Sequence, residues 1–273
     1  PKYFEFIEKL DAPKFEELMK IMFFDKKMPL LKDEGKAVLI SEFGGAYKIY
    51  FSILESIASG KNNAGEIANI FEGKSGVVSK YLDLLRKDYE LILRETPITQ
   101  DPRKSRIGIY RLKDNFLRFW FAFVKRYESY YEQGRTDELY KMFIENYRLF
   151  AGLSFEDLSK EFIIQKNVIN ELPFKFEKIG KWWGKQKSDG LPVEMDIVAL
   201  NETLKSALFL ECKWKDLELN DAKKIIEILK VKSMSLDWIG EKRTDFFGIV
   251  AKHLEGKTEL RKLGFVAFDL RDF

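Results

Sequence analysis

Apolar side chains between residues 46 and 90 recur every three or four positions, which is the spacing of amphipathic helices. The first run predicts a helix that ends at Gly60, because a glycine often follows the last helical turn. A short second helix precedes a turn at Gly73, and a third helix begins at Ser75. The three apolar faces consist of Tyr47, Tyr50, Phe51, Leu54, Ile57 and Ala58, then Ala64, Ile67, Ala68 and Phe71, then Val77, Val78, Tyr81, Leu82, Leu84 and Leu85.

Two extended runs follow the third helix, 91–95 and 106–112, and a loop with Pro97 and Pro102 joins them. Helix, short helix, turn, helix and a two-stranded hairpin is the order of a winged helix-turn-helix, to which we assign residues 46–113. The third helix and the hairpin loop would then contact DNA. The basic candidates for this contact are Lys74, Lys80, Arg86, Lys87, Arg103, Lys104 and Arg106. The domain can instead be a packing module, because the exposed face of the third helix mixes basic, acidic and polar residues.

The segments on either side of this domain are helical in pattern. Residues 1–45 predict short helices, with Pro13 at a first helical position and a break at Pro29. Residues 114–146 open with Asp114, a typical N-cap residue, and continue as an aromatic run that is apolar nearly all round. We therefore interpret 114–146 as a buried helical connector.

The apolar period changes to two in the last part of the chain. Residues 147–273 predict a helix, three strands, a second helix, a fourth strand, a short helix and a last strand. The whole chain is thus expected to be an α+β multidomain protein whose last domain has a central mixed sheet. The strands are expected near 175–183, 193–200, 207–214, 246–250 and 265–270, and the second helix near 221–234.

Charged side chains interrupt apolar faces on two neighbouring strands of this domain. Apolar residues on one face of the third strand give way to Glu211 and Lys213, and Glu194 and Asp196 join an apolar row on the second strand. If these strands form a hairpin with its turn near Thr203, Asp196 and Glu211 lie opposite each other to within a residue or two. The opposite faces are expected to consist of Met195, Ile197 and Ala199 on the second strand and of Leu208, Leu210, Cys212 and Trp214 on the third.

Two carboxylates and an ammonium group on adjacent strands suit a divalent cation that acts on a phosphodiester. Mg²⁺ prefers carboxylate oxygens and water, and it keeps positions open for a phosphate. A bound metal ion lowers the pKa of its water, and Lys213 would orient or deprotonate that water and stabilise developing charge. Asp196 and Glu211 are therefore predicted ligands of Mg²⁺ or Mn²⁺. The alternative is a salt-bridged strand end, in which Lys213 pairs with the acids and nothing is catalysed.

Composition narrows the chemistry further. A single Cys and a single His exclude an internal disulfide and a Cys-based zinc cluster, and they disfavour a Ser-His-Asp mechanism. The net charge is +3, but the segment from residue 74 to residue 126 carries thirteen basic and six acidic residues, a local +7. This is a modest electrostatic footprint for nucleic acid, or else a solvated lysine-rich face. No uninterrupted apolar stretch reaches the length of a membrane span and no signal peptide is visible, so we expect a cytoplasmic protein without a membrane contact.

Asp196 lies fifteen residues ahead of Glu211-Cys212-Lys213, and this spacing resembles the PD-(D/E)XK signature of restriction-endonuclease-like nucleases. Met195 stands where the signature has proline. In that superfamily an acid on the N-terminal helix often joins the site, and Glu156 matches that position. The resemblance therefore implies a catalytic set of Asp196, Glu211, Lys213 and Glu156.

Longer segments of the chain resemble, in the same order, the C-terminal half of archaeal-type AAA ATPases of the STAND-like class. The resemblance implies that a Walker-type ATPase core precedes this region and binds the ATP, and that residues 1–45 are the remnant of its lid. The segments that carry the resemblance are 1–4, the winged helix, 114–120, 152–156, 179–183, 194–201 and 211–214.

These observations predict the DNA-binding and nuclease-like C-terminal region of an archaeal ATPase. Its partners would be duplex or branched DNA and the upstream ATPase core, and an oligomer is compatible with the sequence. One alternative is a non-catalytic DNA- or protein-binding regulatory module with a degenerate nuclease fold. A transcription regulator is a third interpretation, which would require a sequence-specific operator.

Overall fold

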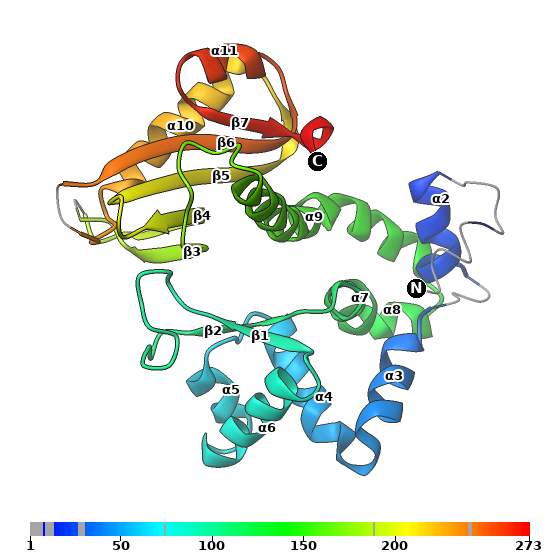
Figure 1. Ribbon diagram of the computed structural model, residues 1–273. Coiled ribbons are helices and arrows are strands. Elements are labelled where there is room, and N and C mark those ends of the chain that lie inside the picture. The colour runs from blue at the N-terminus through cyan, green and yellow to red at the C-terminus, as the bar shows by residue number, and fades with distance from the viewer. Residues whose placement is uncertain (1–7, 9–13, 27–30, 74, 188, 240–241) are drawn as a thin grey trace. The chain divides into compact units, whose positions relative to one another are not determined.

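The computed structural model describes residues 8, 14–26, 31–73, 75–187, 189–239 and 242–273 (Figure 1). The chain forms two compact units. The first comprises residues 1–94 and 109–147, and the second comprises residues 95–108 and 148–273. The loop between the two strands of the predicted hairpin thus belongs to the second unit.

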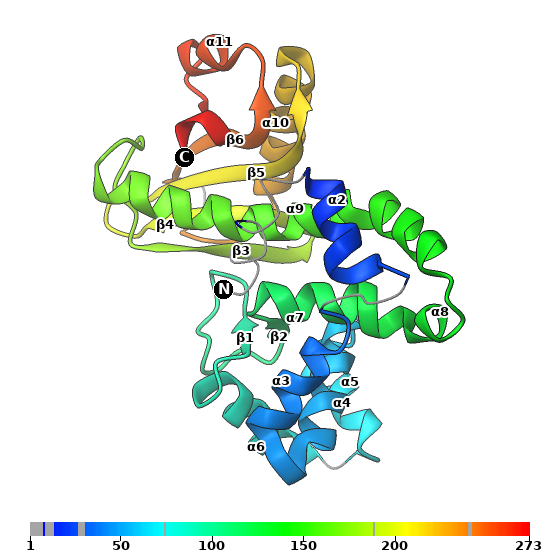
Figure 2. The ribbon, with the colours of Figure 1, turned by 90° about the vertical axis from the view of Figure 1, so that its right-hand side faces the viewer.

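The first unit is helical apart from one small two-stranded sheet, formed by β1 and β2. Figure 2 shows its helices α4, α5 and α6 gathered near these strands. The elements of this unit are α2 (Phe15–Met19), η1 (Lys20–Phe24), α3 (Glu34–Phe43), η2 (Gly44–Ala46), α4 (Tyr47–Ala58), α5 (Ala64–Ile70), α6 (Ser75–Lys87), β1 (Ile92–Glu95), β2 (Ile109–Leu112), α7 (Asn115–Phe119), η3 (Trp120–Val124), η4 (Lys125–Tyr127), α8 (Glu128–Glu132) and the first part of α9 (Thr136–Val168).

Local hydrogen bonds explain where α5 starts. The side chain of Asn63 caps α5 by accepting a hydrogen bond from the Glu66 amide at 2.9 Å, and the Glu66 carboxylate accepts one from the Asn62 amide at 3.2 Å. The three helices and two strands predicted between residues 46 and 113 are confirmed within a few residues, because each has both a clear apolar face and a turn signal at its end. Gly60, with φ of +95°, follows α4 as expected.

The aromatic run after Asp114 is buried, as its pattern predicts. The Asp114 carboxylate accepts a hydrogen bond from the Leu117 amide at 2.7 Å and so caps α7. Trp120 and Phe123 are both nearly inaccessible to solvent, and the ring of Phe123 meets that of the fully buried Phe143 edge-on. These rings supply much of the core of the first unit.

One helical run in the first unit, Glu34–Ala58, is long and apolar enough to cross a membrane by length and composition alone. It consists of α3, η2 and α4, and its backbone turns at Gly44, where φ is +52°. Leu39, Ile53 and Leu54 within it are fully buried in the unit. A core helix passes the same test, so this run is weak support for a span, and the absence of a membrane contact stays a prediction.

The second unit is built on one mixed sheet with the strand order β3-β4-β5-β6-β7. β3 pairs with β4 and β4 with β5 in antiparallel fashion, whereas β5, β6 and β7 run parallel. The parallel connections pass through helices, as such crossovers require. The elements are the second part of α9, β3 (Lys178–Lys185), β4 (Pro192–Asn201), β5 (Ser206–Leu217), α10 (Leu219–Ser233), β6 (Thr244–Leu254), α11 (Lys257–Lys262), β7 (Val266–Asp269) and η6 (Leu270–Asp272).

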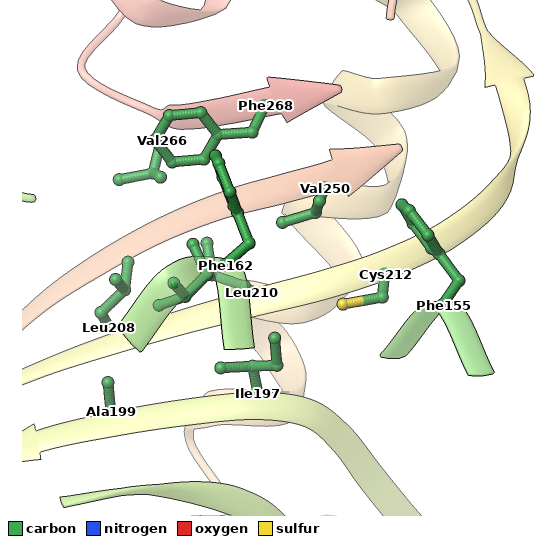
Figure 3. Packing of buried hydrophobic residues seen from close by; sticks show 11 residues of the cluster. Phe155, Phe162, Ile197, Ala199, Leu208, Leu210, Cys212, Val250, Val266 and Phe268 are labelled. Carbon is green, nitrogen blue, oxygen red and sulfur yellow. The ribbon is translucent and has the colours of Figure 1, made fainter. Parts of the chain in front are cut away.

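Helices cover both faces of this sheet. Phe155, Phe162 and Ile163 of α9 pack on one face against alternate residues of β4 to β7, and Figure 3 shows Phe155 and Phe162 over this cluster. Apolar residues of α10 and α11, with Leu229 and Leu260 among them, pack on the other face. The period-two pattern of the sequence therefore separates two apolar layers, one covered by α9 and the other by α10 and α11.

The sequence predicts the five strands correctly in order and place, although their ends shift by up to several residues. Two expectations were wrong. The helices expected before and after residue 147 are one continuous helix, α9, because no glycine or proline signal is strong enough to end it. Met195 packs with Val198 and Leu200 and not with Ile197 and Ala199, because β4 bulges between Met195 and Val198.

Gly248 sits where three strands meet in the middle of the sheet. A Cβ atom at this position would lie 2.1 Å from the carbonyl oxygen of Val266 and 2.8 Å from the side chain of Leu210. We therefore expect Gly248→Ala to lower the free energy of unfolding of the second unit by about 1–3 kcal/mol, since the backbone of β7 must move away.

Urea unfolding of the variant and the parent measures this effect. Gly152→Ala is the matched control, because a Cβ atom there meets nothing within 4 Å and Gly152 lies in α9. The control should stabilise the protein by about 0.5–1 kcal/mol, the usual gain for alanine in a helix. Equal stability of the Gly248→Ala variant and the parent would show that β6 and β7 are not packed this closely.

Candidate active site

The candidate site lies where β4 and β5 separate, a point that we call the fork. Their ladder ends with the pair Ile197 and Leu210, so Asp196 and Glu211 are the next residues on the two strands. The Asp196 carboxylate, and not its backbone, accepts the hydrogen bond of the Cys212 amide at 2.8 Å. The side chain thus satisfies a backbone donor that the ladder no longer serves. Counting outward from the centre of the turn predicts that Asp196 lies opposite Glu211, and the observed ladder has this register.

The bulge in β4 helps to place Asp196 at this fork. β3 advances two residues from Gly180 to Trp182, while β4 advances three from Val198 to Met195, so β4 holds one extra residue. Bulges re-aim side chains and end strand pairing. The segment that contains Asp196 therefore leaves the regular ladder where a charged side chain can reach between the strands.

Lys213 connects the two acids. Its Nζ lies 2.9 Å from a carboxylate oxygen of Glu211 and 3.6 Å from one of Asp196. Lys232 of α10 adds a second ammonium group, 3.1 Å from the same oxygen of Glu211. Glu211 is buried, with 9% of its side chain exposed, so these two contacts provide the positive charge that a buried carboxylate requires.

A second ion pair borders this cluster. Glu156 of α9 and Lys181 of β3 lie 2.5 Å apart, and both side chains are largely buried. Lys181 also lies 3.4 Å from Glu194 at the more exposed end of β4. The negative charge of Glu156 acts on Asp196, so α9 contributes to the electrostatics of the fork. Three acids and three lysines from five elements therefore converge on one part of the second unit.

Burial and the neighbouring charge of Glu211 raise the pKa of Asp196 to about 6, and Lys213 offsets only part of this effect. Burial disfavours the charged form of Lys213, but the carboxylates of Asp196 and Glu211 outweigh it and raise the pKa of this lysine. Lys213 is therefore an ammonium group near neutral pH. In that form it can orient a water molecule and stabilise negative charge, but it cannot accept a proton.

The donor set fits a hard divalent cation. Among the residues that the structure describes, no group of three or more His, Cys, Asp or Glu is arranged to hold a metal ion. Mg²⁺ needs fewer, because it is commonly held by one or two carboxylates together with water and substrate phosphate. The raised pKa of Asp196 means that negative charge at the fork is incompletely compensated, which favours a cation beside Asp196 and Glu211.

The predicted basic residues of the hairpin loop belong to the same unit as this cluster. The amide of Ile98 donates a hydrogen bond to the carbonyl oxygen of Lys181 at 2.9 Å, and the Ile98 side chain packs against the apolar cluster that holds Trp182. Arg103, Lys104 and Arg106 of this loop are exposed. The structure thus attaches the loop to β3, one of the strands that border the acids.

The predicted basic residues of the third helix differ in whether they pair with an acid. Lys80 is exposed on α6. Arg86 and Lys87 both pair with Asp83, at 2.9 Å and 3.3 Å, which reduces the positive charge of this helix face. Lys74 lies outside the described residues. This face therefore carries both basic and acidic side chains, as the sequence predicts.

Sequence reasoning missed two residues of the cluster, Lys181 and Lys232. Both are single lysines on segments that the sequence predicts correctly, but no motif connects them to the acids. Their roles depend on how α10 and β3 pack, which a pattern along the chain does not contain. The one available signal for Lys181 is its position at the start of the Lys-Trp-Trp run that precedes the acidic strand.

In buffer with a metal chelator, we expect Asp196→Asn to be more stable than the parent at about pH 8 and similar to it at about pH 4. The pKa of Asp196 in the folded protein, about 6, is above its ordinary value of 3.8, so the protonated form stabilises the fold. This contribution is fully present below pH 3.8 and is lost as the pH rises through 6. The loss has an upper limit of about 3 kcal/mol, and we expect a gain of about 1–3 kcal/mol for the variant.

Urea unfolding at the two pH values measures this difference. Asp216→Asn on the same sheet is the control, because Asp216 is exposed and pairs with Lys252 at 3.5 Å on the surface. It should change stability little at either pH. An Asp196→Asn variant that is less stable than the parent at about pH 8 would mean that the lysines fully compensate the Asp196 carboxylate.

Residues 120–225 match the model of DUF234, a family of archaeal and bacterial proteins of unknown function. The chain is also similar to an uncharacterized protein of Methanocaldococcus jannaschii, MJECL04, with 40% identity over 226 residues. The aligned part is 82% of this chain and 48% of that relative, so the chain spans about half the length of the curated relative it matches. No solved structure gives a significant match to the chain.

The matched region includes Glu156, Asp196, Glu211 and Lys213 but ends before Lys232. The relative is archaeal, in agreement with the archaeal resemblance inferred from the sequence. Neither the family nor the relative is described as an ATPase or a nuclease, so the resemblance to AAA/STAND ATPases and to PD-(D/E)XK nucleases stays a prediction. What the comparisons support is similarity to DUF234 and to this archaeal relative.

Proposed function

We propose that the second unit is a metal-dependent nuclease domain that hydrolyses phosphodiester bonds in DNA. The observation that carries this proposal is the convergence of Asp196, Glu211 and Lys213 at the fork of two central strands. Carboxylates that can hold a cation, next to a fixed ammonium group, are the groups that phosphodiester hydrolysis requires.

The fold around the fork supports the same proposal. A helix with an acid, three antiparallel strands and a parallel strand reached through a helix follow one another from α9 to β6. This is the order expected of a restriction-endonuclease-like domain, and the spacing of Asp196, Glu211 and Lys213 resembles its PD-(D/E)XK signature. Glu156 on α9 takes the place of the additional acid.

In this proposal each side chain has one task. Asp196 and Glu211 would hold Mg²⁺ or Mn²⁺, and the metal ion would polarise the phosphate and lower the pKa of a water molecule when bound. Lys213, which stays an ammonium group, orients the water and stabilises the charge that develops on phosphate oxygens. Lys232 also pairs with Glu211, and Glu156 pairs with Lys181 near the fork.

Residues 46–113 are proposed to be a winged helix-turn-helix that binds DNA, with the loop 95–108 as its wing. The exposed cations of this loop belong to the second unit through the contact of Ile98 with Lys181. Basic side chains there would hold the phosphate backbone near the candidate site. Duplex or branched DNA is the proposed partner, and an upstream ATPase core that binds ATP is proposed to regulate the assembly.

One observation favours a second candidate function. Lys213 already contacts both acids, which is the arrangement expected of a salt-bridged strand end without catalysis. In that case the second unit is a binding and regulatory module with a degenerate nuclease fold. The two functions differ in whether a divalent cation can bind and support cleavage of DNA at Asp196.

A nicking assay separates these functions. We expect the chain to convert supercoiled plasmid or branched DNA to nicked products with Mg²⁺ or Mn²⁺, and we expect Asp196→Asn and Lys213→Met to lower the rate by about 100-fold or more, since each removes a group that acts on the transition state. Asp216→Asn, on β5 but outside the cluster, should retain the parental rate.

Calorimetry with Mn²⁺ accompanies this assay. Binding that is lost in Asp196→Asn but kept in Asp216→Asn supports a metal-dependent site. Cleavage that persists in Asp196→Asn would show that another site or another protein is responsible. A parent chain that neither binds Mn²⁺ nor nicks DNA supports the non-catalytic module.

The wing can be tested separately from catalysis. In the presence of a chelator, we expect the double variant Lys104→Glu and Arg106→Glu to bind duplex DNA about tenfold more weakly at ~0.1 M salt and to show a smaller salt slope, because fewer counterions are released. Fluorescence anisotropy over a range of salt concentrations measures both effects. Lys14→Glu with Lys262→Glu makes the same change of charge at exposed lysines outside residues 46–113. Equal losses in the two double variants would mean that the loop has no special role.

A further inference from the structure

A cavity of about 320 Å³ lies in the first unit, apart from the carboxylate cluster. Residues from α3, α4, η3, η4 and α8 and from the turn before α3 surround it. Its volume is at the lower end of the range found for small-molecule sites. The size suits one small ligand and not an extended chain.

Aromatic side chains form part of the cavity wall. Trp120 and Phe51 both line it, and their rings meet nearly at right angles with centroids 6.2 Å apart. The indole of Trp120 packs against Gly35, where a Cβ atom would come within 2.3 Å of the ring. The Nε1 atom of Trp120 donates a hydrogen bond to the carbonyl oxygen of Lys32 at 2.6 Å. The buried indole therefore has a fixed position behind the wall, and the half-buried rings of Phe51 and Tyr47 give the cavity its accessible aromatic surface.

Lysines form most of the polar part of the wall. Four lysines line the cavity with only two acids, Asp33 and Glu128, which leaves an excess of two positive charges. One of the acids, Glu128, is already paired with Lys125, whose Nζ also lies 5.6 Å from the centroid of Phe51. The cavity thus combines flat ring surfaces with cations that are available to an anion. The four lysines are Lys32, Lys36, Lys48 and Lys125.

We propose that this cavity binds a nucleotide, with the base against the aromatic wall and the phosphate beside Lys36 and Lys48. A purely apolar ligand leaves the lysines without a partner, and a simple anion leaves the rings without one. A base joined to a phosphate uses both, because bases stack on aromatic rings and phosphates pair with lysines. The nucleotide is either free in solution or the unpaired terminal nucleotide of a DNA strand, since both present the same groups.

Isothermal titration calorimetry of the chain with AMP, adenosine and inorganic phosphate tests this proposal. We expect AMP to bind, and we expect adenosine and phosphate each to bind about tenfold more weakly or not at all, because each offers only half of the contacts. Metal chelator in the buffer prevents any contribution from the carboxylate cluster, so the result does not depend on nuclease activity.

Two variants assign the binding to this cavity. The double variant Lys36→Ala and Lys48→Ala should weaken AMP binding about tenfold or more, whereas Lys14→Ala with Lys61→Ala, exposed lysines that do not line the cavity, should not. Phe51→Leu keeps an apolar side chain but removes the ring, so it should weaken AMP and leave phosphate unchanged. Far-ultraviolet circular dichroism and the melting temperature of each variant show whether it is folded.

A 5′-phosphorylated single-stranded oligonucleotide distinguishes the two sources of the nucleotide. Tighter binding than AMP that depends on Lys36 and Lys48 assigns the cavity to a strand end, and binding no tighter than AMP assigns it to a free nucleotide. The proposal is overturned if AMP does not bind at millimolar concentration, if phosphate binds as well as AMP, or if folded variants of the cavity bind AMP like the parent.

Discussion

The second unit depends on how negative charge is compensated where β4 and β5 separate. Asp196 and Glu211 are mostly buried and directly follow the last paired residues of the ladder. Lys213 lies between them, and Lys232 reaches Glu211 from α10. Removing the charge of Lys213 or Lys232 is costly, because Glu211 would stay charged in a poor solvent for ions. The packing of α9 and α10 on the sheet is therefore tied to the charges at its fork.

Charge compensation alone does not explain why so many charged side chains gather where β4 and β5 separate. A strand end of this kind can be filled by apolar residues of similar volume, and such replacement of buried ion pairs is often neutral or stabilising. The sheet next to the fork is packed in that way, with Leu208, Leu210 and Ile197 in a continuous apolar cluster. Burial and the charge of Glu211 also raise the pKa of Asp196 to about 6, and Lys213 offsets only part of this effect, so the compensation is incomplete. Incomplete compensation is the property that a cation-binding site needs and that a structural salt bridge does not.

The fork could be predicted from the sequence because its geometry is mostly local. The turn near Thr203 fixes the register of β4 and β5 to within a residue or two, so the approach of Asp196 to Glu211 can be expected from the order of residues. The bulge that moves Met195 to the other face has no comparable signal, since it is decided by how β3 meets β4. Lys181 and Lys232 were missed for the same reason: each reaches the acids only through tertiary packing.

The hairpin loop belongs to the second unit in a way that composition does not suggest. Its basic residues lie within a segment that the sequence joins to the helices of the first unit, yet its contacts are with β3 of the second. The contact of Ile98 with Lys181 places exposed cations in the same compact unit as the acids. On α6, in contrast, Asp83 pairs with both Arg86 and Lys87 and offsets part of their charge. The loop, and not the third helix, therefore carries exposed basic side chains within the compact unit that holds the acids.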